Sequence, residues 1–425
     1  MTRNTLTWDF RDSLALRGIA IAAITLHNYF HLLSPVRENE FDFDARRVIV
    51  FLTAACDPRQ IVQSGFSFFG HFGVQVFIFL SAYGLARKYW EHAPAWRLFV
   101  WSRIRKIYPL FLAVIFLWAV MLGLPGGATG PLLVFRENAV SLVLTVLGIL
   151  NLVPGHGFPP VGPWWFIPFI MQFYCLWPLL RRFTMRFGAS GLIALSAASW
   201  LLVGTFNPIP VGGASLNLLL SPIGRLPVIC LGIAAARYGF FPEGALAWLA
   251  GLAFLLSNFY PSMWPFGSVC ALIVAIRAYH HLRPLLRRVE LPVRLGACSM
   301  ALFLVNGFTR DPFVAIASRE KTWMAEILLG VAGLIFAWAF AELLTHRFPQ
   351  WLVSAHGMHA ASAADVRPAA PALAPFAQPL SGKVRYPRST RCLAGPRVVQ
   401  KGAANHEIPG RPAAVARSTR VGSTQ

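Results

Sequence analysis

The sequence predicts an all-α polytopic membrane protein with about ten transmembrane helices and both termini in the cytoplasm. Hydrophobic residues make up 56% of the 425 residues. Charged residues make up only 13%, against roughly 25% in an average soluble domain. The mean hydropathy is +0.56. Apolar runs recur along the first 350 residues, where spans of roughly 20 residues each leave room for about ten helices.

Charge and cysteine content exclude several other classes of protein. A net charge of +21 would indicate nucleic acid in a soluble protein. In a membrane protein it indicates basic cytoplasmic loops that face lipid headgroups, so we expect no nucleic-acid partner. The six cysteines form no C-x-x-C pair and lie mostly in apolar runs, which favours core positions over disulfides or a metal site. The acid-containing N-terminus is interpreted as a cytoplasmic lead-in, not a removed signal peptide.

Eleven apolar runs are candidate spans. Both termini can lie on the same side only if the number of crossings is even, so one run should not cross. Basic loops follow the second, fifth and ninth runs, and all three are cytoplasmic only if one run between 107 and 164 does not cross. The segment 138–154 is short and has asparagine at both ends, so we interpret it as interfacial or re-entrant. The runs lie at about 14–33, 66–86, 107–123, 138–154, 164–180, 190–206, 216–236, 243–259, 264–280, 296–316 and 323–343.

The composition divides the chain in two. Residues 1–350 form the predicted transmembrane domain. Residues 351–425 are rich in alanine, proline and arginine and lack a sustained apolar period, which predicts a disordered, basic cytoplasmic tail. Such a tail either rests on anionic lipid or has no role of its own.

Ionisable residues inside spans are costly and often functional, and the first span contains three. Arg17 is near its cytoplasmic end, and His27 follows about 15 Å further along the helix. His27 and His31 share a helical face, and a histidine suits general-base chemistry near neutral pH. The alternatives are a histidine bonded to a neighbouring helix or one at the outer interface. A metal site is not predicted, because no third ligand is evident.

Basic and polar residues in later segments are further candidates. Arg103, Arg105 and Lys106 cluster before the third span, where they would bind the phosphates of a nucleotide-like donor or simply mark topology and bind lipid. Ser81 in the second span either packs or contacts substrate. Arg225 lies inside a run, between two prolines. It is either buried against a partner, such as an acceptor's carboxylate or phosphate or a backbone carbonyl, or placed at the outer interface.

Five segments in order resemble the acyltransferase 3 family of integral membrane acyltransferases. The first span is similar to the family's opening Arg…His helix, and the later segments are similar to its Leu-Ser-Gly, basic Ile-Tyr-Pro, Trp-rich and late Ser-x-x-x-Tyr motifs. The segments are LRGIAIAAITLHNYFH, GVQVFIFLSAYGLARK, SRIRKIYPL, PWWFIPFIMQFYCLWPLL and LGACSMALFLVNGF.

The resemblance implies a ten-helix enzyme of the bacterial inner membrane. Such an enzyme transfers an acyl group, often acetyl, from cytoplasmic acyl-CoA to a hydroxyl of an extracytoplasmic glycan or lipid-linked sugar. Acyl-CoA is the co-substrate and no bound cofactor is implied. His27 is implied as the catalytic or acyl-carrying residue. Donor binding is implied for Arg17, Arg103, Arg105 and Lys106, with supporting or acceptor roles for His31, Ser81, Arg225 and Asn306.

This sequence departs from the family pattern at several positions. Nine residues, not ten, separate Arg17 from His27, which places Asn28 at the family's usual helical angle. Lys106 replaces the second arginine of the basic motif, and Ile170 replaces the glutamate of the Trp-rich segment. Asn306 replaces the late histidine, and Phe303 the late tyrosine. These changes keep open a rival class, a transporter or a catalytically silent membrane binding protein.

Overall fold

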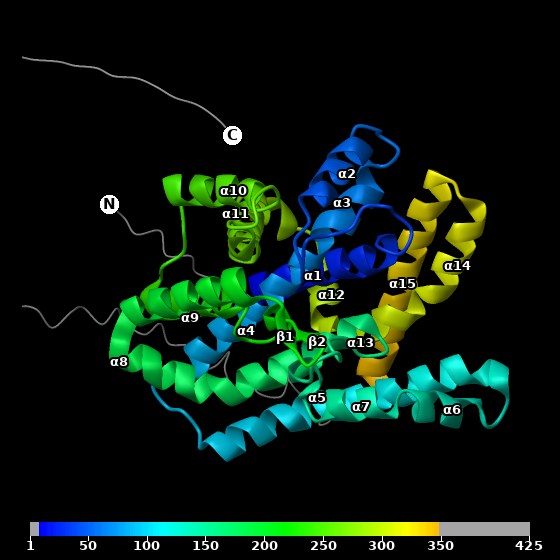
Figure 1. Ribbon diagram of the computed structural model, residues 1–425, viewed down its shortest axis with the longest axis horizontal. Helices are drawn as coiled ribbons and strands as arrows, with labels where there is room; N and C mark the ends of the chain where they lie inside the picture. The colour runs from blue at the N-terminus through cyan, green and yellow to red at the C-terminus, as the bar shows by residue number, and fades with distance from the viewer. Residues whose placement is uncertain (1–7, 348–425) are drawn as a thin grey trace, which may run out of the picture. The chain divides into compact units, whose positions relative to one another are not determined.

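The computed structural model describes residues 8–347, and within them the chain is helical apart from one hairpin (Figure 1). The hairpin pairs β1 (Ile209–Val211) with β2 (Ala214–Leu216) in antiparallel fashion. The all-α part of the prediction is therefore confirmed. The predicted tail, 351–425, lies outside the described residues.

The helices follow one another in two stretches, separated by a loop after α7. The first stretch comprises α1 (Phe10–Phe30), α2 (Ala45–Ala55), α3 (Ile61–Phe69), the 3-10 turn η1 (Gly70–Phe72), α4 (Gly73–Tyr89), α5 (Trp96–Gly123), η2 (Leu124–Gly126), α6 (Gly130–Glu137) and α7 (Ala139–Val146). The second comprises η3 (Leu150–Leu152), η4 (Gly162–Trp165), α8 (Phe166–Phe206), η5 (Leu218–Leu220), α9 (Leu226–Tyr238), α10 (Ala245–Leu256), η6 (Trp264–Phe266), α11 (Gly267–Leu286), α12 (Leu291–Ala297), α13 (Ser299–Thr309), α14 (Asp311–Glu320) and α15 (Trp323–Arg347).

Helix α1 is packed on several sides, by α3, α4, α12 and α13. It begins with a capping box in which Asp9 and Asp12 each accept a hydrogen bond from the other's backbone N–H. At Gly18 the backbones of α1 and α12 touch, because a Cβ there would lie 1.7 Å from the Pro292 carbonyl oxygen. Glycine at this position is thus what allows the close approach of α1 to α12.

A buried carboxylate joins the beginning of α1 to the end of α11. Asp12 accepts hydrogen bonds from the Tyr279 hydroxyl at 3.0 Å and from the guanidinium groups of Arg283 and Arg287. Burial alone would raise the pKa of Asp12, but the bonds from the two arginines hold it far below its ordinary value. The carboxylate is therefore ionised at neutral pH and ties the two helices together.

Five helical segments are long and apolar enough to cross a membrane, and a sixth counts if the bent pair α12–α13 forms one span. Helices α9 and α10 are apolar but only 13 and 12 residues long. The chain is therefore a multi-pass membrane protein, although fewer of its helices are long than the ten predicted runs would suggest. The long segments are Ile61–Tyr89, Trp96–Gly126, Gly162–Phe206, Trp264–Leu286 and Trp323–His346.

Three local features explain the difference from the prediction. The runs 164–180 and 190–206 belong to one helical segment, α8, which is interrupted only at Gly188, where φ is 62°. The run 296–316 contains an 85° bend between α12 and α13. Helix α1 is not among the long apolar segments, since it carries charged residues such as Arg17.

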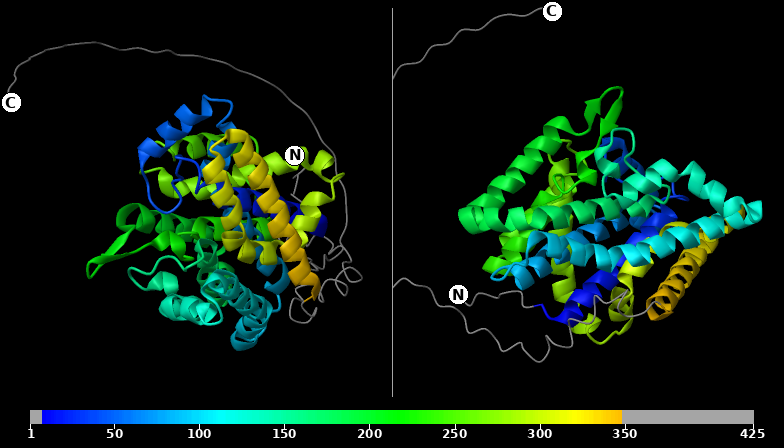
Figure 2. Two further views of the ribbon diagram at one scale, coloured as in Figure 1. Left: turned by 90° about the vertical axis from the view of Figure 1, so that its right-hand side faces the viewer. Right: turned by 90° about the horizontal axis from the view of Figure 1, so that it is seen from below.

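The segment 138–154 forms no long helix. It consists of the eight-residue α7, a turn at Gly148 with φ of 75°, and the short η3. Eight residues extend only about 12 Å, well short of a bilayer crossing. Elsewhere, α14 and α15 lie side by side as a helical hairpin in every view (Figures 1 and 2).

Candidate active site

A cavity of about 350 Å³ lies among α1, α4, α5, α8 and the α12–α13 bend. Four cationic side chains line it, and none of the described residues on its wall is acidic. Such a cavity suits an anionic ligand, because the charged side chains on its described wall are all cationic. Its polar lining residues are Arg17, Ser81, Lys88, Tyr89, Arg103, Lys106, Tyr174, Ser299 and Thr345.

Arg103 is held in the cavity wall by aromatic rings instead of by a carboxylate. Its guanidinium carbon lies 4.9 Å from the ring centre of Phe99, 5.2 Å from that of Tyr174 and 5.5 Å from that of Tyr89. Its Nε is buried and has no hydrogen-bond partner among the described residues. Cation–π contacts position the guanidinium while leaving its N–H groups available to a ligand.

The structure brings together three of the four predicted donor-binding residues. Arg17 from α1 reaches the same cavity as Arg103 and Lys106 from α5. Ser81 lies on its wall as well. Arg105, on the same helix, is exposed and does not line the cavity, so the structure does not bring it together with the other three and its role stays a prediction.

The cavity also contains Lys88, which follows the second apolar run and was not among the predicted site residues. Leu80, Ser81, Gly84, Leu85 and Lys88 all line the cavity from α4. Their spacing of three or four residues is that of one helical face. That spacing, read from Ser81 onwards, was the signal that could have identified Lys88.

His27 does not line the cavity but lies further along α1, in a buried cluster of histidines. Its Nδ1 lies 3.2 Å from the Phe66 carbonyl oxygen and 3.0 Å from that of Ser67. Carbonyls only accept hydrogen bonds, so Nδ1 carries the ring proton and Nε2 keeps the lone pair. The rings of His31 and His71 are centred 5.4 and 5.6 Å from the His27 ring.

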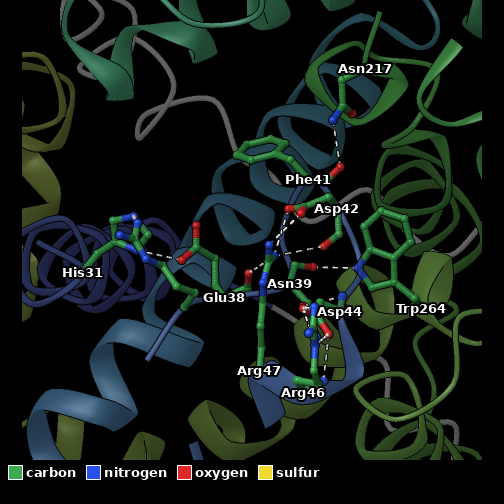
Figure 3. A network of polar contacts seen from close by, with 11 residues as sticks. His31, Glu38, Asn39, Phe41, Asp42, Asp44, Arg46, Arg47, Asn217 and Trp264 are labelled. Carbon is green, nitrogen blue, oxygen red and sulfur yellow. Dashed lines mark hydrogen bonds and ion pairs between the residues drawn. The ribbon is translucent and has the colours of Figure 1, made fainter. Parts of the chain in front are cut away.

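His31 has an acidic partner that sequence analysis did not identify. Its Nδ1 lies 2.7 Å from a carboxylate oxygen of Glu38, in the loop that follows α1 (Figure 3). Burial alone would raise the pKa of Glu38, but the bond to His31 and the neighbouring histidine rings lower it to about 2. Glu38 is therefore a carboxylate at neutral pH and orients the His31 ring.

Arg225 is 1% exposed, so the alternative that places it at the outer interface is wrong. Its guanidinium donates to the Leu219 carbonyl at 3.0 Å, to the Ser268 hydroxyl at 2.7 Å and to Glu40 at 3.2 Å. Burial raises the pKa of Glu40 to about 8, against the opposing effect of Arg225. All three partners belong to the protein, so Arg225 connects the loop after α1 to α9 and α11.

The same loop is held by further polar contacts (Figure 3). The Trp264 indole donates to the Asn39 carbonyl at 2.6 Å, and the Asn217 amide donates to the Phe41 carbonyl at 2.7 Å. Arg47 binds the Asp42 carboxylate and the Glu38 carbonyl. These bonds fix the backbone of the loop over the end of α1.

The two asparagines at departures from the family pattern contact each other. The Asn28 amide donates to the Asn306 side-chain oxygen at 2.6 Å. Asn306 is fully buried, and its own amide donates to the Leu302 and Phe303 carbonyls. The late motif thus packs directly against α1, one residue beyond His27.

The helical membrane fold, the basic cavity and the buried histidines together define a multi-pass membrane acyltransferase. The chain belongs to the acyltransferase 3 family: the model of its acyltransferase domain matches residues 14–342. It is therefore an O-acyltransferase, and membership implies an acyl donor and an acceptor. Neither the curated proteins nor the solved structures provide a match.

Proposed function

We propose that this protein transfers an acyl group, acetyl in the first instance, from cytoplasmic acyl-CoA to a hydroxyl of an extracytoplasmic glycan or glycolipid. The observation that carries the proposal is the cavity, with four cationic residues and no acidic residue on its described wall. CoA bears a pyrophosphate and a further phosphate. Arginine and lysine bind phosphates through charge-assisted hydrogen bonds.

The rest of the cavity wall suits the uncharged part of the donor. It is mostly apolar, with Val74, Phe77, Leu80 and Phe303 among its residues. A pantetheine arm and a short acyl chain would lie against this surface. Arg17 is ten residues before His27, about 15 Å along α1, and a flexible arm would bridge that separation.

His27 is the residue that we propose to serve the acceptor. Its Nε2 would take the proton of the acceptor hydroxyl as the oxygen attacks the thioester carbonyl. The C–S bond then breaks, and the leaving CoA sulfur regains the proton from His27. Alternatively, Nε2 carries the acyl group between donor and acceptor. His31 and Asn306 would support the acceptor end.

For topology, we propose ten crossings with both termini in the cytoplasm of a bacterium, in its inner membrane. In this arrangement one crossing each is made by the short helices α9 and α10, by the two halves of α8 and by the bent pair α12–α13. A reporter inserted at Gly188, the break in α8, should then report cytoplasm, and one at Gly213 the opposite side. An outside signal at Gly188 would contradict this arrangement.

The test of the activity is turnover of labelled acetyl-CoA by the purified protein. We expect hydrolysis or transfer that depends on His27. The rival function, a transporter or silent binding protein, is favoured by one observation: the Asn28–Asn306 contact, with asparagine in place of the family's late histidine. Tight binding of acetyl-CoA without any turnover would support that rival.

A further inference from the structure

We infer that the end of α1 carries a site for a divalent transition metal of the zinc type. His27, His31 and Glu38 each offer a ligand atom, and these atoms lie within 4.8 Å of one another. Two histidines and one carboxylate are a common ligand set for zinc. Nitrogen ligands favour zinc over calcium or magnesium, which prefer oxygen. Sequence analysis did not predict this site because Glu38 is in an irregular loop.

The hydrogen bonds of His27 suit a metal ligand. In metal sites the second ring nitrogen of a ligating histidine usually donates to a carbonyl or carboxylate, which fixes the ring and its tautomer. The carbonyls of Phe66 and Ser67 already hold Nδ1–H in this way. Nε2 is left with its lone pair, in the form that a metal binds.

A third buried histidine points to a missing ligand. His71 is 3% exposed, and its ring is centred 5.6 Å from that of His27. The Phe68 carbonyl is near the ring, yet neither ring nitrogen makes a hydrogen bond of normal geometry. The nearby Gln75 is also fully buried with both amide atoms unpartnered. Buried polar groups without partners call for an additional species, here a metal and its water.

Small movements would complete the coordination. Two ligands at zinc distances in a tetrahedral site lie roughly 3.3 Å apart, so ligand atoms within 4.8 Å of one another need to close by at most about 1.5 Å. Rotation of the Glu38 and His31 side chains would supply this movement while the bond to the Glu38 carbonyl holds the loop backbone. The His31 Nε2 lies 3.3 Å from an Arg37 nitrogen, and the exposed Arg37 side chain can turn away when the ring binds metal.

This inference goes beyond the proposed function, because metal binding needs neither donor nor acceptor. With the metal in place, His27 would serve the acceptor through a metal-bound hydroxyl of lowered pKa instead of as a free base. The measurement is therefore binding, made without acyl-CoA. Loss of metal binding and loss of acyl transfer are separate results.

The experiment titrates zinc into metal-free, tag-free protein in detergent, in competition with a chromogenic chelator. We expect one equivalent of zinc, and with cobalt a visible spectrum typical of tetrahedral coordination. Glu38→Gln and His31→Gln should each weaken zinc binding at least tenfold. His156→Gln, which alters an exposed loop histidine, should leave affinity unchanged and is the matched control.

The spectrum and stoichiometry of the wild-type protein test the site even if a variant does not fold. Variants are compared only where they elute and melt like the wild type in metal-free buffer. Less than a tenth of an equivalent of zinc in the wild type would overturn the inference. Equal affinity in wild type and Glu38→Gln would also overturn it, since the bound zinc would then lie on other histidines.

Discussion

Replacing Arg103 with alanine tests the donor site at the residue whose surroundings are best defined. The side chain is stacked among Phe99, Tyr89 and Tyr174 and has no acidic partner among the described residues. Truncation removes a guanidinium positioned for a phosphate without breaking an ion pair. The expected effect is therefore on donor binding more than on stability.

The magnitude follows from the kind of bond that is lost. A hydrogen bond to a charged group is worth about 1.5–3 kcal/mol, and about 1.4 kcal/mol corresponds to a factor of ten. The KM for acyl-CoA should rise about 10- to 150-fold in Arg103→Ala, with little change in kcat at saturating donor. The KM of Arg103→Lys should lie between those of the wild type and Arg103→Ala, because lysine keeps the charge but loses the planar guanidinium and its stacking.

The assay is release of CoA from acetyl-CoA by purified protein over a range of donor concentrations. Arg105→Ala is the matched control, since Arg105 is on the same helix, is exposed and does not line the cavity. Its KM should equal that of the wild type. If Arg103→Ala also has the wild-type KM, or if both variants are weakened equally, the cavity is not the donor site.

Three other predictions concern the rest of the molecule. In metal-free buffer, His27→Ala should lower the initial rate of transfer by about 10² to 10⁴, as expected for the loss of a general base. His31→Ala should lower that rate much less. If His31→Ala had the larger effect, the role of general base would move to His31. Arg225→Ala should lower the melting temperature, because it leaves the Leu219 carbonyl, the Ser268 hydroxyl and the Glu40 carboxyl without a donor, at about 1–3 kcal/mol for each unpaired buried group, and an unchanged melting temperature would contradict this. Asp12→Asn should lower the melting temperature at pH 7. A carboxyl group whose pKa is lowered on folding stabilises the folded state at pH values above its pKa in the unfolded chain. The difference in melting temperature between Asp12→Asn and wild type should therefore shrink as pH falls below about 4. A difference that does not change with pH would refute the pairing of Asp12 with the two arginines.

Much of the lining of the proposed donor cavity could be predicted from sequence, for a physical reason. Arg103 and Lys106 are three residues apart and therefore share a helical face, whereas Arg105 points elsewhere. Helical spacing alone could have separated Arg105 from the other two. Arg17 joined them only through the resemblance to the family, because no local pattern shows which helix lines the cavity together with α5.

The histidine cluster could be predicted only in part. The spacing of His27 and His31 places them on one face of a helix, but their partners come from a loop and from η1. Glu38 lies in a segment without apolar periodicity, where position depends on long-range bonds such as that between Arg47 and the Glu38 carbonyl. Such bonds leave no signal in a single sequence.

The structure has fewer long helices than the sequence has apolar runs, for a different reason. Apolar runs report hydrophobicity, whereas the length of a helix depends on where the backbone breaks. The basic residues after run 164–180 remain helical, and only Gly188 adopts a left-handed conformation. At 296–316 the reverse holds, since a continuous apolar run contains a sharp bend between Cys298 and Ser299.

The most direct test of the central claim is acyl transfer by protein reconstituted in liposomes. Labelled acetyl-CoA would be supplied with lipid-linked glycans extracted from the source organism, and the label on the glycan measured over time. The account predicts label on a glycan hydroxyl with the wild type and Arg105→Ala, and a loss with Arg103→Ala that high donor concentration reverses. Unchanged transfer by Arg103→Ala at low donor concentration, or no transfer by the wild type, would contradict it.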